Sequence, residues 1–229
     1  MSMKKRLMTR GLLLLGSFFV ILGLIFTPIF PGKMNGLDYM DNLFNMISKG
    51  SSYFIPKAKT DSEQYGGREL AATAKIADEK QARQTVLMLE KNGIAASVSD
   101  GKLQVKGDLG KLLVASLEDA DHMFNNNGTP VTEKYGFPER EVLYNWWTLF
   151  KGIGQDLTKQ EQFADAKIVA NVSKKGLEPA YNYYGVKAMN WQDNIAMILV
   201  ALAFYVIYTL WYGFGIMYVF EGLGLKIGH

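Results

Sequence analysis

The chain has 229 residues, of which 48% are hydrophobic and 21% are charged, and its formal net charge is +3. It contains no cysteine and two histidines, which excludes disulfides, cysteine-ligated zinc, iron–sulfur clusters and c-type haem, and argues against a multi-histidine metal site. No charged residue lies between Arg10 and Lys33 or between Asp193 and Glu221. This distribution predicts a membrane protein rather than a soluble globular one, and we expect no cofactor.

The first uncharged run, residues 11–31, is long enough to cross a hydrocarbon core of about 30 Å as a helix. The basic residues before it resemble a signal peptide, but the apolar stretch is too long and shows no small-residue cleavage site. We therefore expect a cytoplasmic N-terminus at 1–10 and an uncleaved transmembrane helix at 11–31. One face of this helix carries small residues, which allow another helix to approach closely: Gly16, Val20, Gly23 and Thr27.

Residues 34–55 carry an amphipathic pattern, with apolar side chains at helical spacing from Leu37 to Ile47. Because this segment follows a predicted membrane span, one interpretation is a helix that lies in the lipid headgroup layer. An ordinary amphipathic helix packed on the following domain explains the pattern equally well. Residues 56–68 are polar and rich in turn-forming residues, which predicts a linker.

An extracytoplasmic βαββα domain with a ferredoxin-like arrangement is predicted at 69–130. Alternating apolar residues predict a strand at 70–76, and Asp78 and Gly93 mark the start and the end of a helix. The Asp-Gly dipeptide at 100–101 separates two alternating runs and predicts a hairpin, after which a second helix completes the unit. The predicted fold class is therefore α+β.

A further helix–strand unit is predicted at 136–190. Pro138 suits the first turn of a long helix whose apolar residues lie on two sides, so that this helix needs two packing partners. Alternation from Ala166 to Val172 predicts a strand after it. The aromatic residues exceed what so small a core can bury, so we expect a partner-binding surface at Trp146, Trp147 and Phe150.

The second uncharged run predicts a transmembrane helix at 194–220, followed by a cytoplasmic tail at 221–229 that contains Lys226. Basic residues flank both spans on the side of the chain termini, so both termini are predicted in the cytoplasm. The middle of the chain is then predicted on the extracytoplasmic side of the inner membrane. Three hydroxyls on one helix face need hydrogen-bond partners within the bilayer: Tyr205, Tyr208 and Tyr212. The first span, a neighbouring subunit and a quinone-like ligand are the alternatives, of which helix packing is the ordinary one.

The residues from Glu79 to Asp121 resemble the ring-building domain of the YscJ/FliF family, the inner-membrane ring proteins of type III secretion and flagellar basal bodies. The resemblance covers about residues 69–173. It depends on two short motifs. The first, which we call the helix-ending step, ends a helix and consists of Leu89, Asn92, Gly93 and Ile94. The second is a later strand-like motif of Ala166, Lys167 and Ile168. The resemblance implies a small βαββα module that assembles into an oligomeric ring.

The sequence shows no nucleophile–base pair and no phosphate-binding glycine pattern. His122 lies near Asp119 and Asp121, but their spacing does not converge on one side of a helix, so we interpret them as a solvated helix end rather than a metal site. We expect a non-enzymatic structural or accessory subunit of a cell-envelope membrane complex. Its partners would be other membrane-protein subunits or copies of itself and the lipid bilayer, with no nucleic acid. The alternative is a membrane-anchored extracytoplasmic ligand-binding or sensory module.

Overall fold

The computed structural model describes residues 2–99 and 101–225. The chain divides into two compact units: residues up to Ile47 together with those from Met189 onward, and residues 48–188. We call the first the helical anchor and the second the central domain. Lys226 and His229 of the predicted tail, and Asp100 of the predicted turn, lie outside the described residues.

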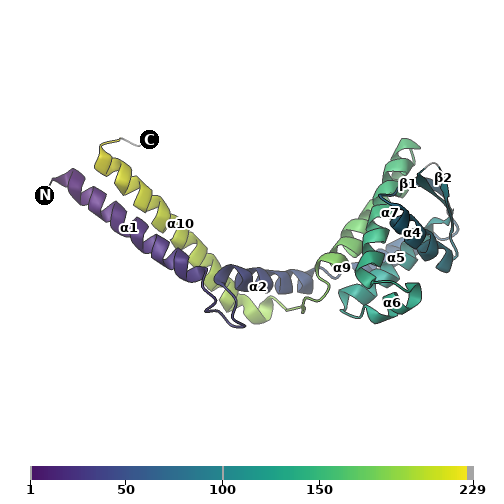
Figure 1. Ribbon diagram of the computed structural model, residues 1–229, viewed down its shortest axis with the longest axis horizontal. Coiled ribbons are helices and arrows are strands. Elements are labelled where there is room, and N and C mark those ends of the chain that lie inside the picture. The colour runs from purple at the N-terminus through teal and green to yellow at the C-terminus, as the bar shows by residue number, and fades with distance from the viewer. Residues whose placement is uncertain (1, 100, 226–229) are drawn as a thin grey trace. The chain divides into compact units, whose positions relative to one another are not determined.

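Two helices of the helical anchor, α1 (Met3–Ile25) and α10 (Ile195–Leu223), are long and apolar enough to cross a membrane. A short 3-10 turn, η2 (Gln192–Asn194), precedes α10. Figure 1 shows α1 and α10 side by side, with the beginning of α1 and the end of α10 at the same end of the pair. The first helix ends earlier than the predicted span, because Pro28 and Pro31 follow and proline cannot continue a helix.

Helix α2 (Gly36–Ser51) lies within the segment predicted to be amphipathic. The Asn35 side chain accepts a hydrogen bond of 2.9 Å from the Asp38 backbone N–H, which caps the start of α2. The predicted linker at 56–68 is wrong for most of its length, because helix α3 (Ile55–Glu63) occupies it. Pro56 fits the first turn of α3, and Ile55, Ala58 and Ser62 are buried within the central domain.

The sheet of the central domain follows the predicted element order. Strand β1 (Glu69–Lys75), helix α4 (Glu79–Lys91), strands β2 (Ala95–Ser99) and β3 (Lys102–Asp108) and helix α5 (Leu109–Phe124) succeed one another. Within the described part of the chain the strands form an antiparallel sheet in the order β1-β3-β2. Gly93 has φ +70°, which confirms the predicted left-handed stop after α4.

Helices follow the sheet and complete the domain: α6 (Thr129–Tyr135), α7 (Glu139–Lys159), α8 (Phe163–Val172), the π-helical turn η1 (Ser173–Leu177) and α9 (Glu178–Asn182). The predicted strand at 166–172 is wrong, because this segment is α8. Its buried residues are Asp165, Ile168, Val169 and Val172, which recur at helical spacing. The described chain is therefore a helix-rich mixed fold with one small antiparallel sheet.

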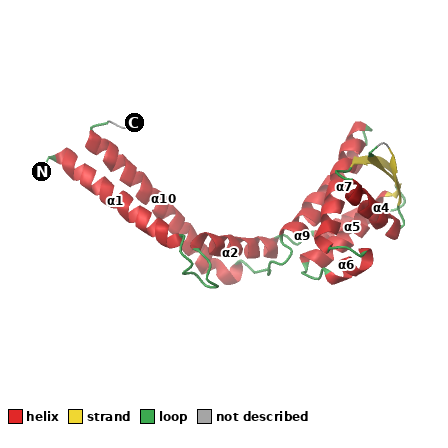
Figure 2. Cartoon of the chain, in the orientation of Figure 1, coloured by secondary structure: helices red, strands yellow, loops and turns green. Residues whose placement is uncertain are grey.

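The core of the central domain lies on one face of the sheet, where Leu70, Ala72, Leu103 and Val105 are buried. Helices α4, α5 and α7 pack over this face, as Figure 2 shows around the yellow strands. Helix α7 approaches β1 so closely that a Cβ at Gly152 would lie 2.5 Å from Ala74 Cβ. Most apolar residues on both sides of α7 are buried, as its sequence pattern predicts, and Trp147 is half-buried.

Candidate interaction sites

The two long apolar helices contact each other through glycines that the sequence analysis did not select. A Cβ at Gly11 would lie 2.7 Å from the Val219 backbone nitrogen, and one at Gly222 would lie 2.7 Å from the Met8 nitrogen. A Cβ at Gly215 would lie 2.9 Å from Leu15 Cδ2. The absence of side chains at these glycines therefore sets how closely α1 and α10 approach.

The predicted small-residue face of α1 is not part of this contact. A Cβ at Gly16 or Gly23 would meet no atom within 4 Å, and Val20 is 65% exposed. Thr27 lies beyond the end of α1, where its hydroxyl donates to the Leu24 carbonyl. This face is therefore not the interface between the two apolar helices of the chain, and its role toward another helix remains a prediction.

The three tyrosines of α10 differ in their surroundings. The Tyr208 ring stacks on Phe18 of α1, with ring centres 4.2 Å apart, and the Tyr212 ring lies 4.9 Å from the same phenylalanine. Tyr205 is 68% exposed. The Tyr208 hydroxyl has no hydrogen-bond partner among the described residues, although its oxygen is buried.

An apolar groove of about 630 Å³ lies within the helical anchor, beside these tyrosines. The groove is lined by residues of α1, of the beginning of α2 and of the first half of α10. Among them are Ile25, Met40, Val200 and Phe204. Tyr208 also lines the groove, so its unpartnered hydroxyl is one of the few polar groups that border it.

Two of the three aromatic residues predicted to bind a partner are buried in the central domain. Trp146 and Phe150 are 0% and 1% exposed, so their predicted role in a partner-binding surface is wrong. The Asp119 carboxylate accepts hydrogen bonds from Trp146 Nε1 at 2.8 Å and from the Tyr135 hydroxyl at 2.6 Å. Burial and the adjacent Asp119 charge raise the pKa of Tyr135 far above its ordinary range.

Asp119 is 2% exposed, which corrects its interpretation as part of a solvated helix end. Lys134 Nζ also lies 3.1 Å from its carboxylate, so the buried charge is paired. Among the described residues, no group of three or more His, Asp and Glu side chains is placed to hold a metal ion.

A second buried polar cluster joins the beginning and the end of the central domain. Lys49, at the end of α2, donates to Asn126 Oδ1 at 2.8 Å and to the carbonyls of Tyr183 and Val186 at 3.0 and 2.7 Å. Asn126 adopts φ +58°, and its amide also donates to the Val186 carbonyl. Burial lowers the pKa of Lys49. No local pattern in the sequence links these residues, because the contacts join distant segments.

The two edges of the sheet differ in the hydrogen bonds that their backbone groups make to the rest of the domain. At the β1 edge, Asp156 of α7 accepts a hydrogen bond of 2.8 Å from the Thr73 backbone N–H. Gln160, the residue directly after the last residue of α7, donates to the Ala71 carbonyl at 3.1 Å. Although burial opposes it, the hydrogen bonds from Thr73 and Gln160 lower the pKa of Asp156. Side chains near the end of α7 thus occupy backbone groups to which another strand would otherwise bond.

Among the described residues, no side chain hydrogen-bonds to the β2 edge from Ala95 to Val98 in the way that Asp156 and Gln160 bond to β1. Val98 pairs with the buried Leu103 on the helix-covered side of the sheet, and yet it is 51% exposed. A groove of about 450 Å³ runs beside it. The lining combines apolar and charged residues: Glu79, Ala82, Arg83, Val86, Leu87, Glu90, Ser97 and Val98. Strand β2 contains no charged residue and no proline, which are the usual protections of an exposed edge.

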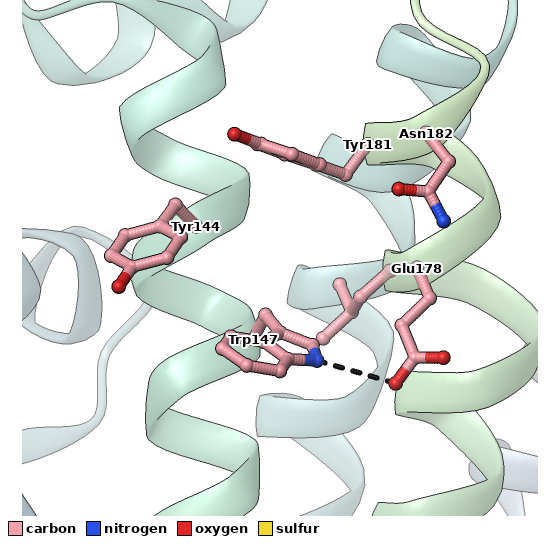
Figure 3. A pocket seen from close by; sticks show the side chains of 6 residues that line it. Tyr144, Trp147, Glu178, Tyr181 and Asn182 are labelled. Atoms are coloured by element: carbon pink, nitrogen blue, oxygen red, sulfur yellow. Dashed lines mark hydrogen bonds between the residues drawn. The ribbon is translucent and has the colours of Figure 1, made fainter.

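The third predicted partner-binding aromatic residue, Trp147, lines a pocket of about 470 Å³ between α7 and α9 (Figure 3). Its Nε1 donates a hydrogen bond of 3.2 Å to Glu178 Oε1, which fixes the indole. Tyr144 and Tyr181 are 48% and 38% exposed at the rim. The full lining consists of Tyr144, Trp147, Leu177, Glu178, Tyr181 and Asn182. We call this the aromatic pocket.

Two cations lie near rings of the aromatic pocket and are not among its lining residues. The Arg140 guanidinium carbon is 6.0 Å from the centre of the Tyr181 ring, and Lys151 Nζ is 5.3 Å from the centre of the Trp147 ring. The sequence singled out Trp147 as a partner-binding candidate. It did not show that Glu178 joins it, because Glu178 and Trp147 are brought together only by the packing of α9 on α7.

No protein-family model, no curated protein and no solved structure gives a significant match to this chain.

Proposed function

We propose that this chain is a non-enzymatic structural or accessory subunit of a multi-subunit complex in a cell-envelope membrane. In this proposal α1 and α10 cross the inner membrane, both termini lie in the cytoplasm and the central domain is extracytoplasmic. The positions of Lys4, Lys5 and Arg6 at the terminal end of the helix pair support this orientation, because basic flanks remain on the cytoplasmic side.

The observation that carries the proposal is the difference between the two sheet edges. The β1 edge is occupied by side chains near the end of α7, whereas no described side chain bonds to the outer backbone groups of β2 from Ala95 to Val98. The groove beside them has both apolar and charged walls. Exposed edges of this kind accept an extended segment from another chain by strand addition. We therefore assign the β2 edge as the surface through which the central domain contacts a neighbouring subunit.

The finer fold assignment is also part of the proposal. The strand order β1-β3-β2, with α4 and α5 after β1 and β3, is that of the first five elements of a ferredoxin-like fold. The fourth strand of that fold would lie beside β1, where Asp156 of α7 and Gln160 lie instead. We infer a ferredoxin-like module in which α7 takes the place of the last strand.

The resemblance to the YscJ/FliF family stays a proposal for residues 69–124. The helix-ending step supports it: the Ile94 N–H donates to the Leu89 carbonyl, Gly93 has a positive φ and both apolar side chains are buried. Residues 163–172 depart from the family pattern, because α8 stands where the resemblance implies a strand.

Single cysteines test the proposal cleanly, because the natural chain has none. We would compare Ser97→Cys on β2 with Ala71→Cys on β1, both exposed, after labelling with a benzophenone maleimide in native membranes. The proposal predicts photo-cross-links to a second polypeptide from position 97 and none from position 71. Absence of adducts at position 97, or equal adducts at both positions, would contradict it.

The second candidate function is a membrane-anchored module that binds a ligand outside the cytoplasm. The aromatic pocket is the observation that favours it, because small-molecule sites combine aromatic walls with a few polar groups in volumes of about 300–1,000 Å³.

A further inference from the structure

The aromatic pocket has the composition of a ligand site rather than of a gap between helices. Tyr144 and Trp147 lie one turn apart on α7 with their ring centres 6.0 Å apart, and Tyr181 reaches toward them from α9 (Figure 3). The hydroxyls of Tyr144 and Tyr181 and the Asn182 amide make no side-chain hydrogen bond to any residue that the structure describes. Three unpaired polar groups thus surround an aromatic floor.

The charges around the pocket disfavour two classes of ligand. The Glu178 carboxylate lines the pocket and would repel an anion such as a phosphate or a carboxylate. Arg140 and Lys151 lie 6.0 and 5.3 Å from the centres of the Tyr181 and Trp147 rings, so the rings already interact with cations. A cation in the pocket would be attracted by Glu178 but repelled by Arg140 and Lys151, and an anion would meet the reverse. Because a ligand of either charge meets an opposing repulsion, a neutral ligand is favoured.

The walls also exclude a purely apolar ligand. Such a ligand would cover the Glu178 carboxylate and the Asn182 amide without offering hydrogen bonds, which costs about 1–3 kcal/mol for each buried polar group. A neutral molecule that suits this pocket has a flat C–H face for the indole and several hydroxyls for the polar groups. Pyranose sugars have both properties.

We propose that the aromatic pocket binds a neutral pyranose unit of a saccharide. The sugar ring lies on Trp147 and its neighbouring tyrosines, while its hydroxyls donate to Glu178 and exchange hydrogen bonds with the Asn182 amide. The Trp147–Glu178 hydrogen bond holds the indole in place before the ligand arrives, which reduces the entropy lost on binding. The inference rests on the proposed extracytoplasmic placement of the central domain, where envelope glycans are accessible.

The full chain, purified in a polyoxyethylene detergent, is the material for the test. Maltoside and glucoside detergents are avoided because their head groups would compete for the pocket. Chitotriose and maltotriose are the neutral probes, choline chloride is the cationic probe and sodium acetate the anionic one, each followed by isothermal titration calorimetry. We expect saturable binding of at least one of the two oligosaccharides and none of choline or acetate.

Substitutions separate this pocket from other surfaces. Trp147→Ala, which removes the aromatic floor, is expected to weaken saccharide binding at least about tenfold, the effect of removing a central aromatic contact. Glu178→Gln keeps the shape of the side chain and is expected to weaken binding by about threefold or more, through loss of a charged acceptor. The matched control is Trp191→Ala, because Trp191 is 47% exposed and lies in the helical anchor.

Three results would overturn the inference: no oligosaccharide binding by the intact chain, binding of choline or acetate at the pocket, or equal saccharide affinity in the Trp147→Ala variant. Circular dichroism of each variant shows whether it is folded, and Glu178→Gln tests the pocket even where Trp147→Ala unfolds. Cross-linking from position 97 reports on the proposed assembly separately. If cross-links persist and saccharide binding is absent, the pocket assignment alone is wrong.

Discussion

The Asp119 carboxylate accepts a 2.8 Å hydrogen bond from Trp146 Nε1 in the interior of the central domain. This contact joins α5 to α7. Trp146, which the sequence analysis predicted to bind a partner, is therefore a core residue. The same carboxylate receives the Tyr135 hydroxyl and lies near Lys134, so that one buried charge connects three helices.

Replacing Asp119 should therefore destabilise the domain strongly. In Asp119→Ala the Trp146 N–H and the Tyr135 hydroxyl are left buried without an acceptor, at a cost of about 1–3 kcal/mol each. We expect the free energy of unfolding to fall by about 3 kcal/mol in urea denaturation. Glu118→Ala, on the exposed side of the same helix, is the control and should change it by less than about 0.5 kcal/mol.

The close contact between α7 and β1 gives a second test. Gly152→Ala introduces a methyl group that would lie 2.5 Å from Ala74 Cβ, so we expect a loss of about 1–3 kcal/mol from overpacking. Gly154→Ala, two residues away on α7, meets only Val169 Cγ1 at 3.8 Å. This control should be neutral or stabilising by up to about 1 kcal/mol, because alanine favours helix. Equal effects of the two substitutions on thermal denaturation would show that α7 does not approach β1 in this way.

The packing of the two apolar helices can be tested with a disulfide. A Cβ at position 215 would lie 3.5 Å from Leu14 Cβ, within the range of about 3.5–4.5 Å that disulfides require. The double variant Leu14→Cys/Gly215→Cys should form an intramolecular disulfide on mild oxidation, seen as a shift in non-reducing electrophoresis after proteolysis between the helices. Gly16→Cys/Gly215→Cys should not, because a side chain at Gly16 meets nothing within 4 Å.

Acid should weaken the central domain through its hydrogen-bonded carboxylates. Hydrogen bonds from the Lys111 and Gly67 backbone N–H groups lower the pKa of Asp108, and those from Thr73 and Gln160 lower that of Asp156, although burial opposes both shifts. A depressed pKa stabilises the folded state above the unfolded value of 3.8, and this stabilisation is lost as the pH falls through the lower folded value.

We therefore expect the melting temperature of the central domain to change little through these two groups between pH 7 and 5 and to fall below about pH 4. The Asp156→Asn variant should be less stable at neutral pH and should show a shallower acid decline. A variant with an unchanged acid decline would exclude the Asp156 contact as a source of the pH dependence.

The sheet of the central domain could be predicted from sequence because its signals are local. Alternation at 70–76, the Asp78 cap and the Gly93 stop each involve residues close in the chain, and the structure places β1 and α4 there. The prediction of a strand at 166–172 was wrong because its signal is not decided locally. The spacing of its apolar residues fits both the two-residue period of a strand and the 3.6-residue period of a helix. The packing of α8 against α7 favours the helix.

The candidate sites depend on contacts between distant segments, and so most of them were inaccessible to sequence reasoning. The burial of Trp146 depends on Asp119 in another helix, and the aromatic pocket depends on Glu178 lying beside Trp147. In the helical anchor, the spacing of small residues predicted a helix-packing face that includes Gly16 and Gly23. The close contacts instead lie at Gly11, Gly215 and Gly222, where the small residues of both helices coincide.

The central claim is that the chain works as part of an assembly whose contacts include the β2 edge. The most direct measurement is the native mass of the protein extracted from its own membranes, compared with that of a Val98→Lys variant that places a charge on this edge. We predict a mass that exceeds one chain for the natural protein and a smaller assembly for the variant. A single chain with no bound polypeptide, in the natural protein and the variant alike, would contradict the account.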